Sequence, residues 1–145
     1  MQSYSISPEE IRQGLEKLES TIPWAHYFNF GHGIETVSPQ EEKFYKKAVG
    51  LGKLGNLLID IVPLNCHRGN MKDLRVLDLA SAEGVHSITL AKAGANVLGI
   101  EGRELYVERA TFAAKVLGVD NARFQQGDVR KINPSEVGTF ECVLF

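Results

Sequence analysis

The chain has 145 residues, the length of one ordinary domain, and can bury a hydrophobic core without a disulfide framework or a structural metal. Hydrophobic residues make up 43% and charged residues 23%, which is typical of a folded globular protein and excludes a disordered or collagen-like chain. The 16 basic and 18 acidic side chains give a formal net charge of -2, so a general affinity for polyanions is excluded and nucleic acid could bind only at a local patch.

The two cysteines, Cys66 and Cys142, are too few for a disulfide framework and do not have the spacing of metal ligands. We predict that both are free thiols in a reducing compartment. The N-terminus has no basic segment followed by an apolar core, and the apolar run at residues 57–62 is far shorter than the roughly 20 residues of a membrane span. We therefore expect a cytoplasmic protein with no membrane partner.

Residues 1–70 are predicted to form an N-terminal helical cap or lid region. Ser7, Pro8 and Glu10 supply a helix start, because a capping serine is followed by proline at the first helical position and by glutamate three residues on. The same device recurs at residues 38–41 and predicts a second helix. Three glycines at positions 50, 52 and 55 predict a kink or break in that helix, and residues 63–70 are predicted to form a loop.

An aromatic segment at residues 24–34 separates the two predicted helices. One interpretation is a hydrophobic clasp that packs the first helix onto the main domain, and the other is a lid over a ligand pocket. His26 and His32 lie in this segment, but no third potential metal ligand follows at a spacing typical of a metal site, so we predict no metal site.

Residues 71–145 alternate strand-length apolar runs with helix-length amphipathic segments. Strands are predicted at residues 74–79, 96–101, 121–126 and 140–145, with helices at residues 84–93 and 103–117. This alternation predicts an α/β fold, a Rossmann-like open parallel sheet with flanking helices. With about four strands, the sheet is expected to be incomplete, as if truncated after strand four.

Three carboxylates, Asp78, Glu101 and Asp128, fall where three successive strands are predicted to end. Ligands of open α/β sheets bind outside the carboxyl ends of the strands, so these acids are expected on one rim. Glu101 could accept from both hydroxyls of a ribose, Asp128 from an adenine amino group with the Val129 amide opposite, and Asp78 could lie near a ligand ammonium. The alternative for each acid alone is a helix cap or a solvated turn residue.

The turn at residues 78–84 has one glycine, Gly84, where a dinucleotide site has three. Its acids Asp78 and Glu83 would repel a pyrophosphate. We therefore predict a positively charged or zwitterionic adenosyl ligand, S-adenosylmethionine rather than NAD.

Four segments, VLDLASAEG at residues 76–84, VLGIE at 97–101, FQQGDV at 124–129 and FECVL at 140–144, together resemble the class I S-adenosylmethionine-dependent methyltransferases. Residues 24–34 also show a faint similarity to methyltransferases that act on tRNA wobble uridines. The resemblance implies methyl transfer to an acceptor, a small molecule or RNA, that the sequence does not identify. The predicted cofactor-binding residues are Asp78, Ala80, Ser81, Ala82, Glu83, Gly84, Glu101, Gly102, Gly127, Asp128 and Val129.

The sequence departs from the family pattern at Ala80 and Ala82, where glycine is usual and where alanine is strained if φ is positive. No catalytic residue can be identified, and His26 and His86 are only candidates for a general base. Three further strands of the family fold would follow residue 145, so catalysis by this chain stays open. One alternative is a non-catalytic binding or assembly module, with a homo-oligomer covering the edge of strand four. The other is an NAD-binding oxidoreductase.

Overall fold

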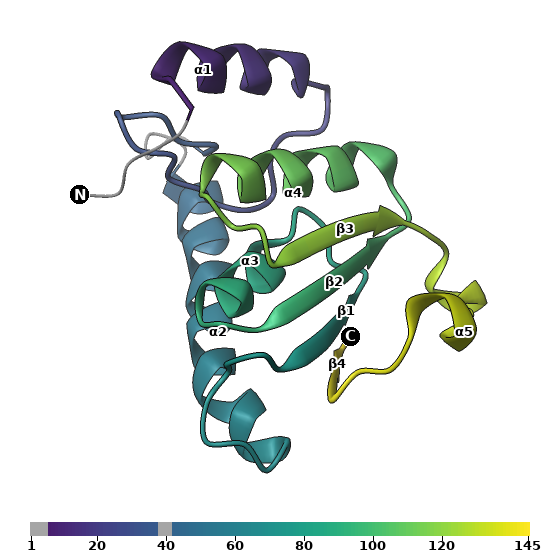
Figure 1. Cartoon of the computed structure of the whole chain (residues 1–145). Coiled ribbons are helices and arrows are strands. Elements are labelled where there is room, and N and C mark those ends of the chain that lie inside the picture. The colour runs from purple at the N-terminus through teal and green to yellow at the C-terminus, as the bar shows by residue number, and fades with distance from the viewer. Residues whose placement is uncertain (1–5, 38–41) are drawn as a thin grey trace.

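The computed structural model describes residues 6–37 and 42–145, and within them four parallel strands form one sheet in the order β3-β2-β1-β4 (Figure 1). The strands are β1 (Arg75–Leu79), β2 (Asn96–Glu101), β3 (Ala122–Gln126) and β4 (Cys142–Leu144). The predicted α/β, Rossmann-like fold is confirmed. The fourth strand is shorter than predicted and begins at Cys142.

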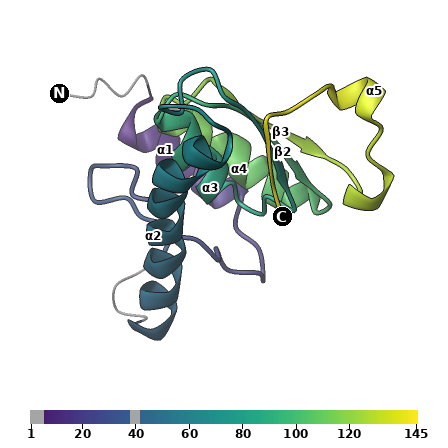
Figure 2. The same cartoon turned by 90° about the horizontal axis from the view of Figure 1, so that it is seen from below.

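The main helices lie on one face of this sheet. They are α2 (Glu42–Asn65), α3 (Val85–Lys92) and α4 (Glu104–Val116), whereas the short α5 (Pro134–Val137) lies on the opposite side (Figure 2). Each crossover from β1 to β2 and from β2 to β3 runs through one helix, as parallel neighbours require. The carboxyl ends of β1, β2 and β3 therefore meet at one edge of the sheet (Figure 1).

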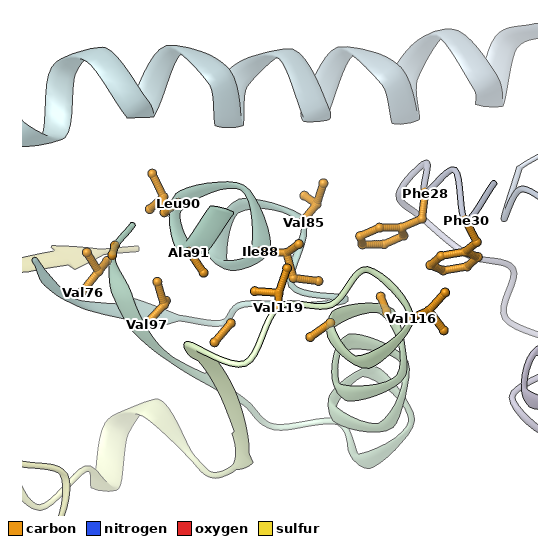
Figure 3. Close-up of a cluster of buried hydrophobic side chains, with 14 of the residues drawn as sticks. Phe28, Phe30, Val76, Val85, Ile88, Leu90, Ala91, Val97, Val116 and Val119 are labelled. Atoms are coloured by element: carbon orange, nitrogen blue, oxygen red, sulfur yellow. The ribbon is translucent and has the colours of Figure 1, made fainter. Parts of the chain in front are cut away.

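The hydrophobic core fills the space between this sheet face and the helices. Side chains of α3, including Val85, Ile88 and Leu90, lie between α2 and the sheet residues Val76 and Val97 (Figure 3). Full burial of such a side chain stabilises the fold by about 1.5–3 kcal/mol. This core fixes the positions of the strand ends.

The N-terminal segment begins with a capped helix and packs on the core through aromatic rings. Helix α1 (Pro8–Lys17) begins as predicted, since Ser7 Oγ accepts from the Glu10 amide at 3.3 Å and the Glu10 carboxylate accepts from the Ser7 amide at 2.8 Å. Phe28 stacks on Phe30, and the Phe30 ring meets Phe112 of α4 edge-on at 5.7 Å. Phe30 thus joins residues 24–34 to α4, a contact that the clasp interpretation expects.

Helix α2 corrects two of the sequence predictions. It runs without a break from Glu42 to Asn65, through all three glycines, and it includes Pro63, so a break at the glycines and the predicted loop start at residue 63 are wrong. A Cβ at Gly55 would lie 3.2 Å from His86 Nδ1 and from Thr89 Oγ1, so glycine allows α2 to approach α3 closely. This packing outweighs the low helix propensity of glycine, about 1 kcal/mol per residue. The helix start predicted at residues 38–41 lies outside the described residues.

Among the helices in the described part of the chain, none combines the length and hydrophobicity that crossing a membrane requires.

Candidate cofactor site

The site begins at the turn that joins β1 to α3. Ala80, Ala82 and Gly84 all have positive φ, at 58°, 49° and 76°. A Cβ at Gly84 would lie 2.6 Å from the Phe124 ring, so glycine is required there for space as well as for conformation. The two alanines adopt the left-handed conformation that the sequence identified as strained for them, at a cost of about 1–3 kcal/mol each.

The structure brings the ends of β1, β2 and β3 together through hydrogen bonds. Glu101 Oε2 accepts from the amide of Ala82 at 2.9 Å, which ties the end of β2 to the turn after β1. The Glu101 carbonyl accepts from the amide of Gly127 at 3.0 Å, which ties it to the residue after β3. The predicted rim of strand ends is thus a connected unit.

A cavity of about 600 Å³ opens at this rim, within the size range of small-molecule sites. Five of its lining residues are among those predicted: Ala80, Gly102, Gly127, Asp128 and Val129. Two more, Gln126 and Arg130, were not predicted.

The unpredicted Gln126 lies at the last position of β3, and its side-chain amide donates to the Gly102 carbonyl at 3.1 Å. Its place at a strand end was the signal that could have identified it. A larger cavity of about 720 Å³ lies between α4 and β3, but it contains none of the predicted residues. Size alone therefore does not identify the site.

Glu101 is the acid most firmly held at the rim. Its side chain is 5% exposed and accepts from Arg103 Nε at 2.8 Å, while the Arg103 side chain itself is 57% exposed. Burial alone would raise the pKa of Glu101, but the hydrogen bonds from Arg103 and from the Ala82 amide together lower that pKa below its usual value. Glu101 is therefore a carboxylate at neutral pH.

Asp128 lies at the mouth of the cavity with Arg130 as its partner. Arg130 donates to both carboxylate oxygens, at 2.9 Å and 2.7 Å, and the Arg130 side chain is 83% exposed. The hydrogen bonds from this guanidinium lower the pKa of Asp128 to about 2. Like Glu101, Asp128 is an ionised acceptor with an arginine partner.

Asp78 is buried, and its Oδ2 accepts from the Ser87 hydroxyl at 2.6 Å. Burial raises the pKa of Asp78 above its ordinary value of 3.8, and the Ser87 bond offsets only part of this effect. A buried acid with a raised pKa favours the protonated form, so its ionisation at neutral pH opposes folding.

We expect Asp78→Asn to increase the free energy of unfolding at pH 7. Because the pKa of Asp78 is raised in the folded chain, the stability that this carboxyl contributes is full below about pH 4 and is lost as the pH rises through the folded-state pKa. Asparagine cannot ionise and keeps an oxygen for Ser87. Urea unfolding at pH 4 and pH 7 should show a smaller fall in stability for the variant than for the wild type. The exposed Asp120→Asn serves as the control, and equal falls for Asp78→Asn and wild type would contradict this expectation.

Glu83 was predicted to bind the cofactor, and the structure places its side chain in a different set of contacts. The residue is fully buried, and its carboxylate accepts from the amides of Ala25 and His26 at 3.0 Å and 2.9 Å. It also meets His26 Nδ1 at 3.0 Å and Arg109 at 2.9 Å. Glu83 therefore connects the cofactor turn to the N-terminal segment, and it is absent from the residues that line the 600 Å³ cavity.

Arg109, on α4, was not predicted from the sequence, although it is only 1% exposed. Besides Glu83, its guanidinium donates to the carbonyls of Leu18, Ile22 and Pro23 at 2.8–3.3 Å. It also lies 4.8 Å from the centre of the Trp24 ring. A buried arginine that binds three carbonyls of a distant segment leaves no periodic signal in the sequence.

The remaining predicted residues lie around the turn. Ser81 is buried, its amide donates to the Ile100 carbonyl at 3.2 Å, and its hydroxyl has no hydrogen-bond partner in the described part of the chain. The pKa of His86, a candidate base, is lowered by burial and then by the neighbouring His26, so His86 is neutral at pH 7. No group of three or more His, Cys, Asp or Glu side chains among residues 6–37 and 42–145 is arranged to hold a metal ion.

Comparison with known proteins gives consistent matches. A family model described as "Methyltransferase domain" matches residues 70–145. The 23S rRNA (uracil(1939)-C(5))-methyltransferase RlmD of Pseudomonas aeruginosa is 46% identical over 87 residues, which cover 49% of this chain and 19% of that protein. RlmD of Shewanella piezotolerans is 35% identical over 85 residues, covering 48% of this chain and 19% of that protein. The chain thus spans about a fifth of these curated relatives.

Among solved structures, the N-terminal domain of EvdMO1 with SAH bound superposes with a TM-score of 0.72. It is 26% identical and covers 99% of this chain and 55% of that chain. Magnesium protoporphyrin IX methyltransferase (ChlM) from Synechocystis with bound SAH has a TM-score of 0.59 at 23% identity, covering 91% of this chain and 51% of that chain, and shows the same fold.

Proposed function

From the premise that the chain belongs to the methyltransferase domain family, with S-adenosylmethionine as its cofactor, we propose that it transfers the cofactor's methyl group to an acceptor nucleophile. The observation that carries the proposal is the joined rim of strand ends, where ionised Glu101 is bonded to the turn after β1 and ionised Asp128 lines a cavity of about 600 Å³. The cofactor supplies an activated methyl group on a sulfonium. Protein groups need chiefly to align the acceptor with that methyl and to exclude water.

Each rim residue has a proposed part in holding the cofactor. Glu101 accepts from the two ribose hydroxyls once the exposed Arg103 side chain has moved aside. Asp128 and the Val129 amide bind the adenine edge, because both line the cavity. Asp78 is buried and is proposed to lie near the cofactor's ammonium, whose positive charge would favour ionisation of this carboxyl.

The backbone shapes the rest of the proposed site. Ala80, Gly102 and Gly127 line the cavity with main chain and at most a methyl group, so a ligand can approach them closely. Ser81, Ala82 and Gly84 form the turn, and Glu83 anchors it through its buried ion pair with Arg109. The predicted residues thus divide into those that contact the cofactor and those that hold the turn in place.

The acceptor is proposed to be RNA or a small molecule. The curated relatives that match about half of the chain carry the name of a 23S rRNA uracil methyltransferase, which supports an RNA acceptor. Because the formal net charge of the chain is -2, RNA would have to bind at a local patch of the surface. Transfer of tritium from labelled S-adenosylmethionine to a 23S rRNA transcript tests this choice, with label retained only in the cofactor as the contrary result.

The experiment that tests the function is calorimetry of the wild-type chain with S-adenosylhomocysteine, with NADH as the control ligand. We expect S-adenosylhomocysteine to bind and NADH not to bind, because the ionised Glu101 disfavours a pyrophosphate at the turn. A folded sample that binds neither would overturn the methyltransferase proposal in favour of a binding or assembly module. Light scattering of the same sample would then show whether an oligomer covers β4, where Val143 is 56% exposed.

A further inference from the structure

The chain's two cysteines meet in space although 75 residues separate them in sequence. Cys66 follows the last residue of α2, and Cys142 is the first residue of β4. The Cys66 thiol donates to the carbonyl of Glu141, the residue directly before Cys142, at 3.4 Å. This hydrogen bond brings the Cys66 thiol next to the residue that precedes Cys142, and both cysteines are partly exposed. We propose that Cys66 and Cys142 form a reversible intrachain disulfide, a modification site that takes a small oxidised thiol such as oxidised glutathione as its reactant.

Contacts that do not involve sulfur hold the pair in place. Arg68, two residues after Cys66, donates to Glu141 Oε1 at 2.8 Å, and the Arg75 amide donates to Glu141 Oε2 at 3.1 Å. The Glu141 amide in turn donates to the Arg75 carbonyl at 2.9 Å. The loop after α2 is thus fixed to the start of β4 on both sides of the thiols. Neither cysteine has to be present for the other to be positioned.

The two thiols have different parts in the reaction. Burial and then the neighbouring Cys66 raise the pKa of Cys142, so Cys142 is protonated at neutral pH. Cys66 is therefore expected to react first. Its thiolate attacks a sulfur of oxidised glutathione, the glutathione S–S bond breaks, and one glutathione thiolate leaves.

The second step closes the bond. Cys142 loses its proton to water and attacks the Cys66 sulfur of the mixed disulfide, which expels the second glutathione thiolate. Overall, two protein thiols are oxidised to one disulfide and one oxidised glutathione is reduced to two glutathiones. The new bond joins the end of α2 to β4, a strand of only three residues whose Leu144 lies opposite Asp78 of β1.

The test is oxidation of the dilute 145-residue chain with oxidised glutathione, followed by denaturation, alkylation with N-ethylmaleimide and intact mass measurement. We expect a monomer that is lighter by two hydrogens and carries no maleimide, and dithiothreitol should restore two alkylation sites. The oxidised chain should also unfold at a temperature about 5 °C or more higher, because the bond closes a long loop that contains β1, β2 and β3.

Two controls separate native proximity from random oxidation. Cys66→Ser and Cys142→Ser should each show no loss of two hydrogens and no rise in unfolding temperature. A urea concentration of roughly 8 M unfolds most domains of this size. The wild type should therefore form the disulfide faster in buffer than in urea, since only the folded chain brings the two thiols together. A persistent glutathione adduct on the folded wild type, disulfide-linked dimers, or an equal rate in urea would overturn the proposal.

Discussion

Glu83→Gln is expected to lower the free energy of unfolding by about 3–5 kcal/mol, the cost of leaving a buried charge without its partner. The variant removes the negative charge that faces Arg109, which is 1% exposed and has no other acid within ion-pair distance in the described residues. It also replaces one acceptor oxygen with a donor group beside the amides of Ala25 and His26. Since folded domains are stable by only about 5–15 kcal/mol, urea unfolding will show the loss clearly.

A matched control lies one residue from Arg109 on the same helix. Glu108 is exposed, so Glu108→Gln makes the same chemical change at the surface and is expected to alter stability by less than about 0.5 kcal/mol. The variant Arg109→Met should also be destabilised, because it removes the guanidinium that faces the buried Glu83 carboxylate. If Glu83→Gln unfolds at the same urea concentration as Glu108→Gln, the buried network does not anchor the N-terminal segment.

Glu101→Ala is expected to have the largest effect on cofactor binding. Loss of each hydrogen bond between a carboxylate and a ribose hydroxyl should cost about 1.5–3 kcal/mol. Each 1.4 kcal/mol is tenfold in affinity, so the dissociation constant of S-adenosylhomocysteine should rise by at least about tenfold for each bond. Isothermal titration calorimetry measures this directly. Glu101→Gln, which keeps one acceptor oxygen, should fall between the alanine variant and the wild type.

Arg103→Ala provides the control for that experiment. In the structure Arg103 donates to both oxygens of Glu101, at 2.8 Å and 3.2 Å, so it competes with a ribose for the same carboxylate. Removing the arginine leaves the carboxylate in place and should keep or increase the affinity for S-adenosylhomocysteine. Equal affinity of Glu101→Ala and the wild type would show that the ribose binds elsewhere.

The fold could be predicted from the sequence because its signals are local. The apolar runs that became β1, β2 and β3 are each followed by a helical pattern or a turn, and parallel neighbours joined by helices follow from that order. The acids Asp78, Glu101 and Asp128 could be assigned to one rim for the same reason, since a parallel sheet places all its strand ends at one edge. For Ala80 and Ala82, the sequence predicted strain if φ was positive, but it did not predict the sign of φ.

The roles of Glu83, Arg109 and the glycines of α2 could not be predicted, because they depend on contacts between distant segments. Glu83 lies in the cofactor turn by sequence, but the residues that bind its carboxylate come from positions 57 and 58 residues earlier and 26 residues later in the chain. The low helix propensity of glycine predicts a break at Gly55, but α2 continues because α3 packs against that glycine. The contact of Cys66 with Glu141, next to Cys142, likewise appears only when the loop after α2 is placed beside β4.

The two alanines in the cofactor turn have one more consequence. Alanine samples fewer backbone conformations than glycine, so a turn built with Ala80 and Ala82 has less freedom to lose when a ligand orders it. The chain already adopts the unfavourable left-handed geometry when it folds. The free-energy cost of this geometry therefore lowers the stability of the fold and does not lower the affinity for the ligand. The turn is therefore preorganised, and its entropic contribution to ligand affinity should be more favourable than that of a glycine-rich turn of the same shape.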